Sequence, residues 1–143
     1  MPKAHGSDHD PIRQLMNIAL WIAQFFLAFS LFYSGGTKAF IPMDILAAQW
    51  PSIGALAPPI VRLLGVIDML GAIGLIVPTI LRIKPALTVI AAWGVVLLMV
   101  CATVFHIQHK ETAQVGVNLL FGSIALFIAW GRSRKAVIPE RMK

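Results

Sequence analysis

Residues 60–77 read IVRLLGVIDMLGAIGLIV, an almost unbroken apolar run in which Asp68 is the single acidic residue. A helix of about 20 residues is long enough to cross the hydrocarbon layer of a bilayer. Three further apolar runs of similar length lie before and after this one. The sequence therefore predicts an all-α integral membrane four-helix bundle, with spans at about residues 15–34, 60–78, 85–106 and 113–131.

The composition supports a membrane protein. Apolar residues make up 58% of the 143-residue chain and charged residues only 13%. A soluble domain of this size has too little interior to hide so much apolar surface, which excludes a soluble enzyme, a disordered tail and a fibrous repeat. Cys101 is the single cysteine, so no disulfide or CxxC pair can form within the chain. The basic residues form no stripe interleaved with aromatics, and nucleic acid is not an expected partner.

The basic residues also predict the orientation in the membrane. Four spans place both termini on one side, and nine of the twelve basic residues fall on that side; the other three are Lys38, Arg62 and Lys110. The positive-inside rule then predicts a multi-pass protein of the inner (plasma) membrane with both termini cytoplasmic. In this interpretation residues 1–13 form a cytoplasmic tail, residues 14–131 a single domain, and residues 132–143 a basic cytoplasmic tail.

Glycines and prolines suggest where the spans end. We expect Gly35 and Gly36 to close the first span and Gly131 to close the fourth, because glycine favours helix termination. The first outer loop is too long for a bare turn, and its residues 40–53 combine Trp50 with several aliphatics and few charges. We expect an interfacial or partly re-entrant segment there, since such a stretch is too apolar to remain in water.

Polar and small residues indicate which helix faces point into the bundle, because lipid does not sort faces by hydrophobicity. Each span carries one such stripe at helical spacing. The stripes consist of Asn17, Gln24, Ala28, Gly35 and Lys38; of Gly65, Asp68, Gly71 and Ala72; of Thr88, Ala92, Val95, Met99, Ala102 and His106; and of Asn118, Gly122, Ala125 and Ala129.

The polar members of these stripes predict an outward-facing ligand site with a carboxyl group at its base. Its candidate residues are Lys38, Arg62, Asp68, His106, Asn118 and Gln24. The cationic residues and His106 lie at outer helix ends, whereas Asp68 and Gln24 lie near mid-membrane. The inner half offers only Asn17 as a comparable group.

Asp68 is the strongest candidate in this site. Burying an ionised carboxylate at mid-membrane costs at least about 2.5–3.5 kcal/mol, so Asp68 must be protonated, paired or hydrated. Arg62 is six positions away, about 240° around the same helix, which makes Lys38 of the neighbouring span the better partner. A functional carboxyl and a structural ion pair both remain open.

The other candidates have alternative roles. His106 is either a solvated helix-end residue or a group that exchanges protons near neutral pH. Lys38 and Arg62 are interfacial anchors or counter-ions, and Gln24 and Asn118 suit interhelical hydrogen bonds. No catalytic set is evident, and no metal site is predicted, because His5 with His9 and His106 with His109 each lack a third ligand.

Several short motifs resemble the DoxX-like family of small four-helix bacterial membrane proteins. They are SGGTK at 34–38, RLLGVID at 62–68, the pattern Met99, Ala102 and His106, and Gly131-Arg132. The resemblance covers about residues 13–134, although many relatives have Glu where this chain has Asp68. It implies the same fold and a link to membrane redox systems, including quinone-coupled sulfur oxidation, or to assembly or stress tolerance; it implies no catalytic residue.

Together these observations favour an accessory protein over a self-sufficient enzyme. The leading hypothesis is a small lipophilic or quinone-like ligand, bound near Lys38, Asp68 and His106, and a membrane or periplasmic oxidoreductase as partner. A second hypothesis is a non-enzymatic scaffold or assembly partner. A third is a proton-coupled small-solute transporter, for which the apolar inner half lacks a path unless a homo-oligomer builds one.

Overall fold

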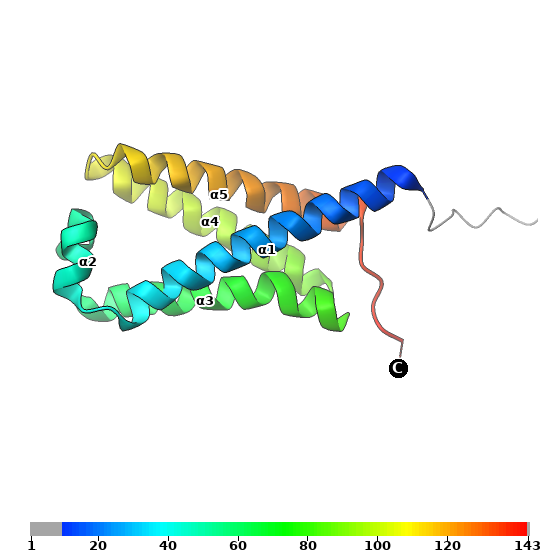
Figure 1. Cartoon of the computed structure of the whole chain (residues 1–143), viewed down its shortest axis with the longest axis horizontal. Coiled ribbons are helices and arrows are strands. Elements are labelled where there is room, and N and C mark those ends of the chain that lie inside the picture. The colour runs from blue at the N-terminus through cyan, green and yellow to red at the C-terminus, as the bar shows by residue number, and fades with distance from the viewer. Residues whose placement is uncertain (1–9, 143) are drawn as a thin grey trace, which may run out of the picture.

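The computed structural model describes residues 10–142, which form four long helices and a short helical segment at one end (Figure 1). His5, His9 and most of the predicted N-terminal tail lie outside the described residues. The elements are α1 (Pro11–Phe40), α2 (Met43–Gln49), the 3₁₀ turn η1 (Pro51–Ala55), α3 (Pro58–Leu81), α4 (Ala86–Gln108), α5 (Thr112–Trp130) and the π-helical turn η2 (Gly131–Lys135), which extends α5.

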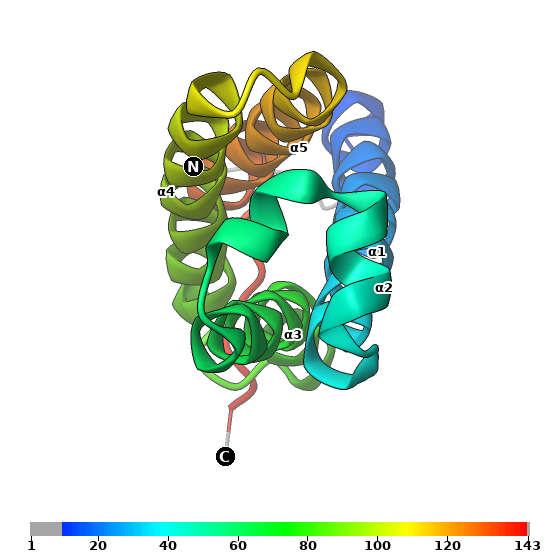
Figure 2. The same cartoon turned by 90° about the vertical axis from the view of Figure 1, so that its left-hand side faces the viewer.

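The long helices form two pairs that separate toward one end. α1 packs chiefly on α3 and α4 on α5, while α3 joins the pairs and α1 contacts α5 only briefly. The pairs diverge toward the end that carries α2 and η1, which we call the cap end, and come together toward the opposite, tail end (Figure 1). The short segment formed by α2 and η1, the cap, lies across the end of the bundle (Figure 2).

The surface of the bundle suits lipid. All four long helices are long and apolar enough to cross a membrane. Large apolar side chains cover their outer faces; Phe29, for example, is 75% exposed and Leu97 65% exposed. Such an apolar surface is stable in a bilayer and not in water. The all-α fold with four membrane-spanning helices is therefore confirmed.

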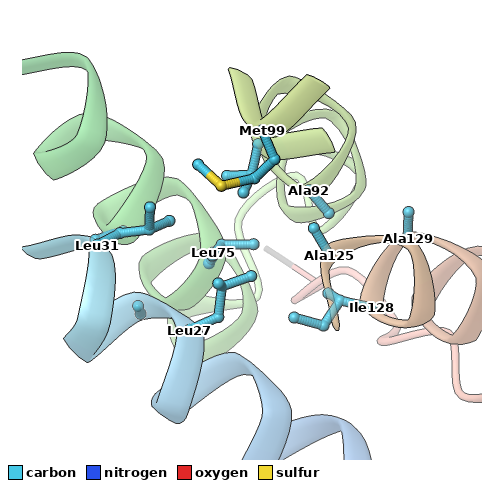
Figure 3. Packing of buried hydrophobic residues seen from close by; sticks show 11 residues of the cluster. Leu27, Leu31, Leu75, Ala92, Met99, Ala125, Ile128 and Ala129 are labelled. Atoms are coloured by element: carbon cyan, nitrogen blue, oxygen red, sulfur yellow. The ribbon is translucent and has the colours of Figure 1, made fainter. Parts of the chain in front are cut away.

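The interior contains the small and polar stripes that the sequence predicts. Leu27, Leu31 and Leu75 meet Met99 and Ile128 at the centre, beside the small residues Ala92, Ala125 and Ala129 (Figure 3). Small residues let helix backbones approach closely, and close packing supplies much of the association energy in lipid.

The prediction that Gly35 and Gly36 end the first span is wrong, because α1 continues to Phe40. Gly35 instead allows α1 to cross α3 closely: a Cβ atom built on Gly35 would lie 2.5 Å from the carbonyl oxygen of Gly65. One on Gly65 would lie 2.7 Å from the carbonyl oxygen of Gly35. Helix packing therefore overrides the weak helix propensity of glycine here.

Two other helix ends differ from expectation. α3 continues through Pro78 to Leu81. A proline removes only one backbone N–H donor from the helix, and in membrane helices neighbouring groups can bind the carbonyl oxygen that is left without this donor. Gly131 keeps right-handed helical angles, and the chain continues as η2. A Cβ atom on Gly131 would lie 2.5 Å from a side-chain carbon of Leu20, so this glycine also serves close packing.

The cap is folded and packed against the bundle. Leu46 of α2 and Ile53 of η1 are buried against Val61 of α3. Trp50, between the two short elements, packs on the same cluster. These contacts explain the apolar character of residues 40–53, which cover the cap end of the bundle.

Candidate functional site

A cavity of about 310 Å³ lies at the cap end, where the two helix pairs separate. Its walls are mainly apolar and come from α1, the cap, α3, α4 and α5. Four of the six predicted site residues line it: Lys38, Asp68, His106 and Asn118. The structure thus brings together side chains from all four long helices.

Lys38 and Asp68 form an ion pair on one wall of the cavity. Lys38 Nζ donates to Asp68 Oδ2 at 2.7 Å, and the hydroxyl of Ser34 donates to the same oxygen at 3.3 Å. The Asp68 side chain is 3% exposed, whereas that of Lys38 is 25% exposed. The expected pairing of Asp68 with Lys38 rather than Arg62 is confirmed, because the close α1–α3 crossing at Gly35 and Gly65 brings the two residues together.

Arg62 lies beside this wall but does not line the cavity. One of its terminal amino groups donates to the backbone oxygens of Lys38 and Ile41, at 2.6 and 2.7 Å. These carbonyls belong to the end of α1, where helical partners are missing. Arg62 therefore holds the end of α1, and with it Lys38, against α3.

His106 connects the opposite wall to the cap through Glu111. Its Nδ1 lies 2.5 Å from Glu111 Oε2, and the Ser52 hydroxyl donates to that oxygen at 2.7 Å. The backbone N–H of Ser52 donates to Oε1 at 3.0 Å. Burial raises the pKa of Glu111, but the bonds from Ser52 and the contact with His106 outweigh it and leave that pKa below its ordinary value. Glu111 thus joins η1 to the start of α5.

Asn118 of α5 is the remaining polar group of the cavity. It is buried, and its amide nitrogen has no hydrogen-bond partner within residues 10–142. An unpaired buried donor is costly, by about 1–3 kcal/mol. Asn118 thus lines the cavity with an amide whose nitrogen the described residues leave unpaired.

Gln24 lies elsewhere, in a second polar cluster nearer the tail end. Its amide nitrogen donates to Leu75 O at 2.5 Å and to Thr79 Oγ1 at 3.3 Å, while its oxygen accepts from Arg132 Nε at 2.6 Å. The Thr79 and Thr88 hydroxyls lie 2.7 Å apart. The expectation that the inner half holds only Asn17 is therefore wrong, since Arg132 turns inward from η2 and joins this cluster.

Three cavity or cap residues were not predicted as site residues. Ser34 stands four positions before Lys38, so helical spacing places it on the same face. Ser52 and Glu111 are distant in sequence, and no periodicity relates a cap residue to the turn between α4 and α5. In the part of the chain that the structure describes, no three His, Cys, Asp or Glu side chains are grouped closely enough to hold a metal ion.

The comparison with known proteins agrees with this architecture. The model of the DoxX-like family matches residues 22–128, which include most of α1, the cap, all of α3 and α4, and nearly all of α5. No match is found among curated proteins or among solved structures. The family match spans well over half of the chain and ends only two residues short of the end of α5. This multi-pass membrane protein therefore belongs to the DoxX-like family.

Proposed function

We propose that the protein binds a small lipophilic, quinone-like molecule in the cap-end cavity, as an accessory to a membrane oxidoreductase. In this proposal it lies in the inner membrane with the cap end outside and both termini in the cytoplasm. The excess of basic residues at the tail end supports that orientation.

The cavity itself is the observation that carries the proposal. Small-molecule sites are concave and mostly apolar, with a few polar groups that fix the orientation of the ligand. This cavity has that composition, and its volume of about 310 Å³ is at the lower end of the usual range. Ile60 of α3 and Cys101 of α4 line it and are also exposed on the outer surface. They support entry from the lipid, between α3 and α4.

The polar groups suit a ligand with oxygen acceptors. The ammonium group of Lys38 and the unpaired amide of Asn118 are donors on different helices, and carbonyl oxygens of a quinone-like ring accept such bonds. Asp68 and His106 are the groups that exchange a proton with bound ligand in this proposal. The chain supplies binding and proton exchange, while the partner oxidoreductase supplies the electrons.

The ligand load of the purified protein tests the proposal. After mild detergent extraction, mass spectrometry should detect a co-purified quinone or similar lipophilic molecule in the native protein. Asp68→Asn removes the charge that holds Lys38 in place, and we expect about a tenfold lower load, the equivalent of one charge-assisted hydrogen bond.

Asp44→Asn is the matched control, because Asp44 is an exposed acid of α2 that does not line the cavity. Its ligand load should equal that of the native protein. Equal loads in native and Asp68→Asn protein would contradict the proposed function.

A further inference from the structure

Arg132 is a buried cation at the tail end of the bundle. It is 3% exposed, and its guanidinium group donates to the side-chain oxygens of Gln24 and Asn17, each at 2.6 Å, and to the backbone oxygen of Ala136 at 3.2 Å. The guanidinium carbon also lies 5.3 Å from the ring centre of Trp21. All of these partners are neutral.

The charge of Arg132 therefore lacks a counter-charge. Within residues 10–142, no carboxylate forms an ion pair with it, and one of its terminal amino groups has no hydrogen-bond partner. Burying an unpaired charge is expensive, and buried cations in membrane proteins are normally paired or reach an anionic group. Hydrogen bonds within the described part of the protein satisfy two of the three guanidinium nitrogens and leave the third without an acceptor.

A second cavity, of about 490 Å³, reaches this arginine. Arg132, Thr79 and Ser133 supply polar groups to its wall. The rest of the wall is mainly apolar and comes from the start of α4 and the C-terminal segment: Pro85, Ala86, Val89, Ile90, Val137 and Ile138. Glu140 also borders it, but is exposed and forms no ion pair with Arg132.

We propose that this tail-end cavity binds the phosphate group of an anionic membrane lipid, with Arg132 as its counter-charge. A guanidinium group matches phosphate oxygens in geometry and charge. The apolar wall favours a lipid over a free phosphate ion, since only a lipid brings hydrocarbon to cover it. The turn between α3 and α4, which carries exposed Arg82 and Lys84, and η2, which carries exposed Arg134, lie at the same end of the bundle (Figure 1). Their charges raise the local positive potential. This site is separate from the cap-end cavity and does not depend on the proposed function.

Lipid retention measured by native mass spectrometry tests the proposal. The full-length protein is purified, delipidated and titrated with phosphatidylglycerol, with diacylglycerol of the same chains, or with inorganic phosphate. We expect phosphatidylglycerol to bind and to raise the melting temperature, and diacylglycerol, which lacks the phosphate, to do neither. Binding of diacylglycerol equal to that of phosphatidylglycerol would overturn the proposal.

Variants separate the site from general surface charge. Arg132→Gln should weaken phosphatidylglycerol binding about tenfold, and Arg134→Gln, a matched change of an exposed arginine outside the cavity, by much less. Because Arg132→Gln also disturbs the Gln24 cluster, Val137→Trp provides a second test. Val137 lines the cavity and is half-exposed, so we expect a tryptophan there to occupy the cavity while Arg132 keeps its hydrogen bonds.

The outcomes discriminate between sources of the anion. Weaker binding in both Arg132→Gln and Val137→Trp supports a lipid site at this cavity. Equal losses of phosphatidylglycerol binding in Arg132→Gln and Arg134→Gln, or unchanged binding in Val137→Trp, would overturn the lipid site. Either result would favour diffuse attraction of the lipid to the basic surface. Stabilisation by inorganic phosphate equal to that by the lipid would overturn the lipid as the source.

Glu140→Gln should tighten phosphatidylglycerol binding, since it removes from the rim of the cavity a negative charge that repels the lipid phosphate.

Discussion

At the residue scale, Asp68 shows how one buried carboxyl group organises the end of a neighbouring helix. Its Oδ2 accepts from both Lys38 and Ser34, which lie one helical turn apart on α1. Arg62, from the same helix as Asp68, holds the last carbonyls of α1. Four polar groups at the end of α1 are thus bound by two residues of α3, which positions Lys38 at the cavity wall.

Glu111 has the same organising role on the other side of the cavity, and its effect depends on pH. Its pKa is lower in the folded protein than in the unfolded chain. The stabilisation that ionised Glu111 provides is therefore complete at pH values above its pKa in the unfolded chain, about 4.3. This stabilisation is lost as the pH falls through the lower pKa of Glu111 in the folded protein. We expect the cap to loosen in that acidic range. The fluorescence of Trp50, in a variant whose other tryptophans are phenylalanine, reports this between about pH 7 and about pH 3.

Glu111→Gln is the control for this titration, because it removes the carboxylate and keeps the shape of the side chain. It should give, already at neutral pH, the fluorescence that the native cap reaches in acid. An identical pH profile in native and Glu111→Gln protein would show that another group controls the cap.

At the element scale, the crossing of α1 and α3 determines the geometry of the cap-end cavity. The two helices meet at Gly35 and Gly65, where the backbones touch without intervening side chains. This contact lies within one turn of Lys38 and Asp68 in the sequence. The ion pair therefore depends on the distance between the helices and not only on the two charged residues.

Gly35→Ala tests this dependence. Its Cβ atom would lie 2.5 Å from the carbonyl oxygen of Gly65, so the helices must separate. We expect a loss of about 1–3 kcal/mol in the free energy of unfolding, as for other overpacked sites, together with a lower ligand load. Thermal unfolding in detergent measures the first effect.

Gly36→Ala is the matched control, because nothing lies within 4 Å of a Cβ atom at that position. Alanine there should raise stability by about 0.5–1 kcal/mol, as in other helix interiors. Equal destabilisation by both substitutions would contradict the assigned role of the Gly35 contact.

At the scale of the whole molecule, the four helices form a bundle that is closed at one end and separated at the other. At the tail end, Arg132 and Gln24 connect η2, α1 and α3 through hydrogen bonds. At the cap end, the helix pairs diverge and the cap covers the space between them (Figures 1 and 2). The molecule thus presents the cap-end cavity at one end, and a basic surface beside the tail-end cavity at the other.

The proposed orientation predicts which end is accessible from outside the cell. In a Cys101→Ala background, Lys110→Cys should react with a membrane-impermeant maleimide on intact cells, because Lys110 lies in the turn at the cap end. Arg134→Cys, at the tail end, should react only after lysis. The reverse pattern would contradict the positive-inside assignment.

The sequence by itself determined the four spans and the inward-facing stripes, and it favoured Lys38 over Arg62 as the partner of Asp68, a pairing that the close α1–α3 crossing then decided. These follow from apolar run length, helical periodicity and the cost of an unpaired charge, all of which are local properties. Only the tertiary structure decided where Gln24 and Arg132 lie, and that Ser52, Glu111 and His106 join the cap to the bundle. Those contacts depend on how far the helices separate and on side chains distant in sequence, and helix packing at Gly35 and Gly131 overrode the local preference of glycine to end a helix.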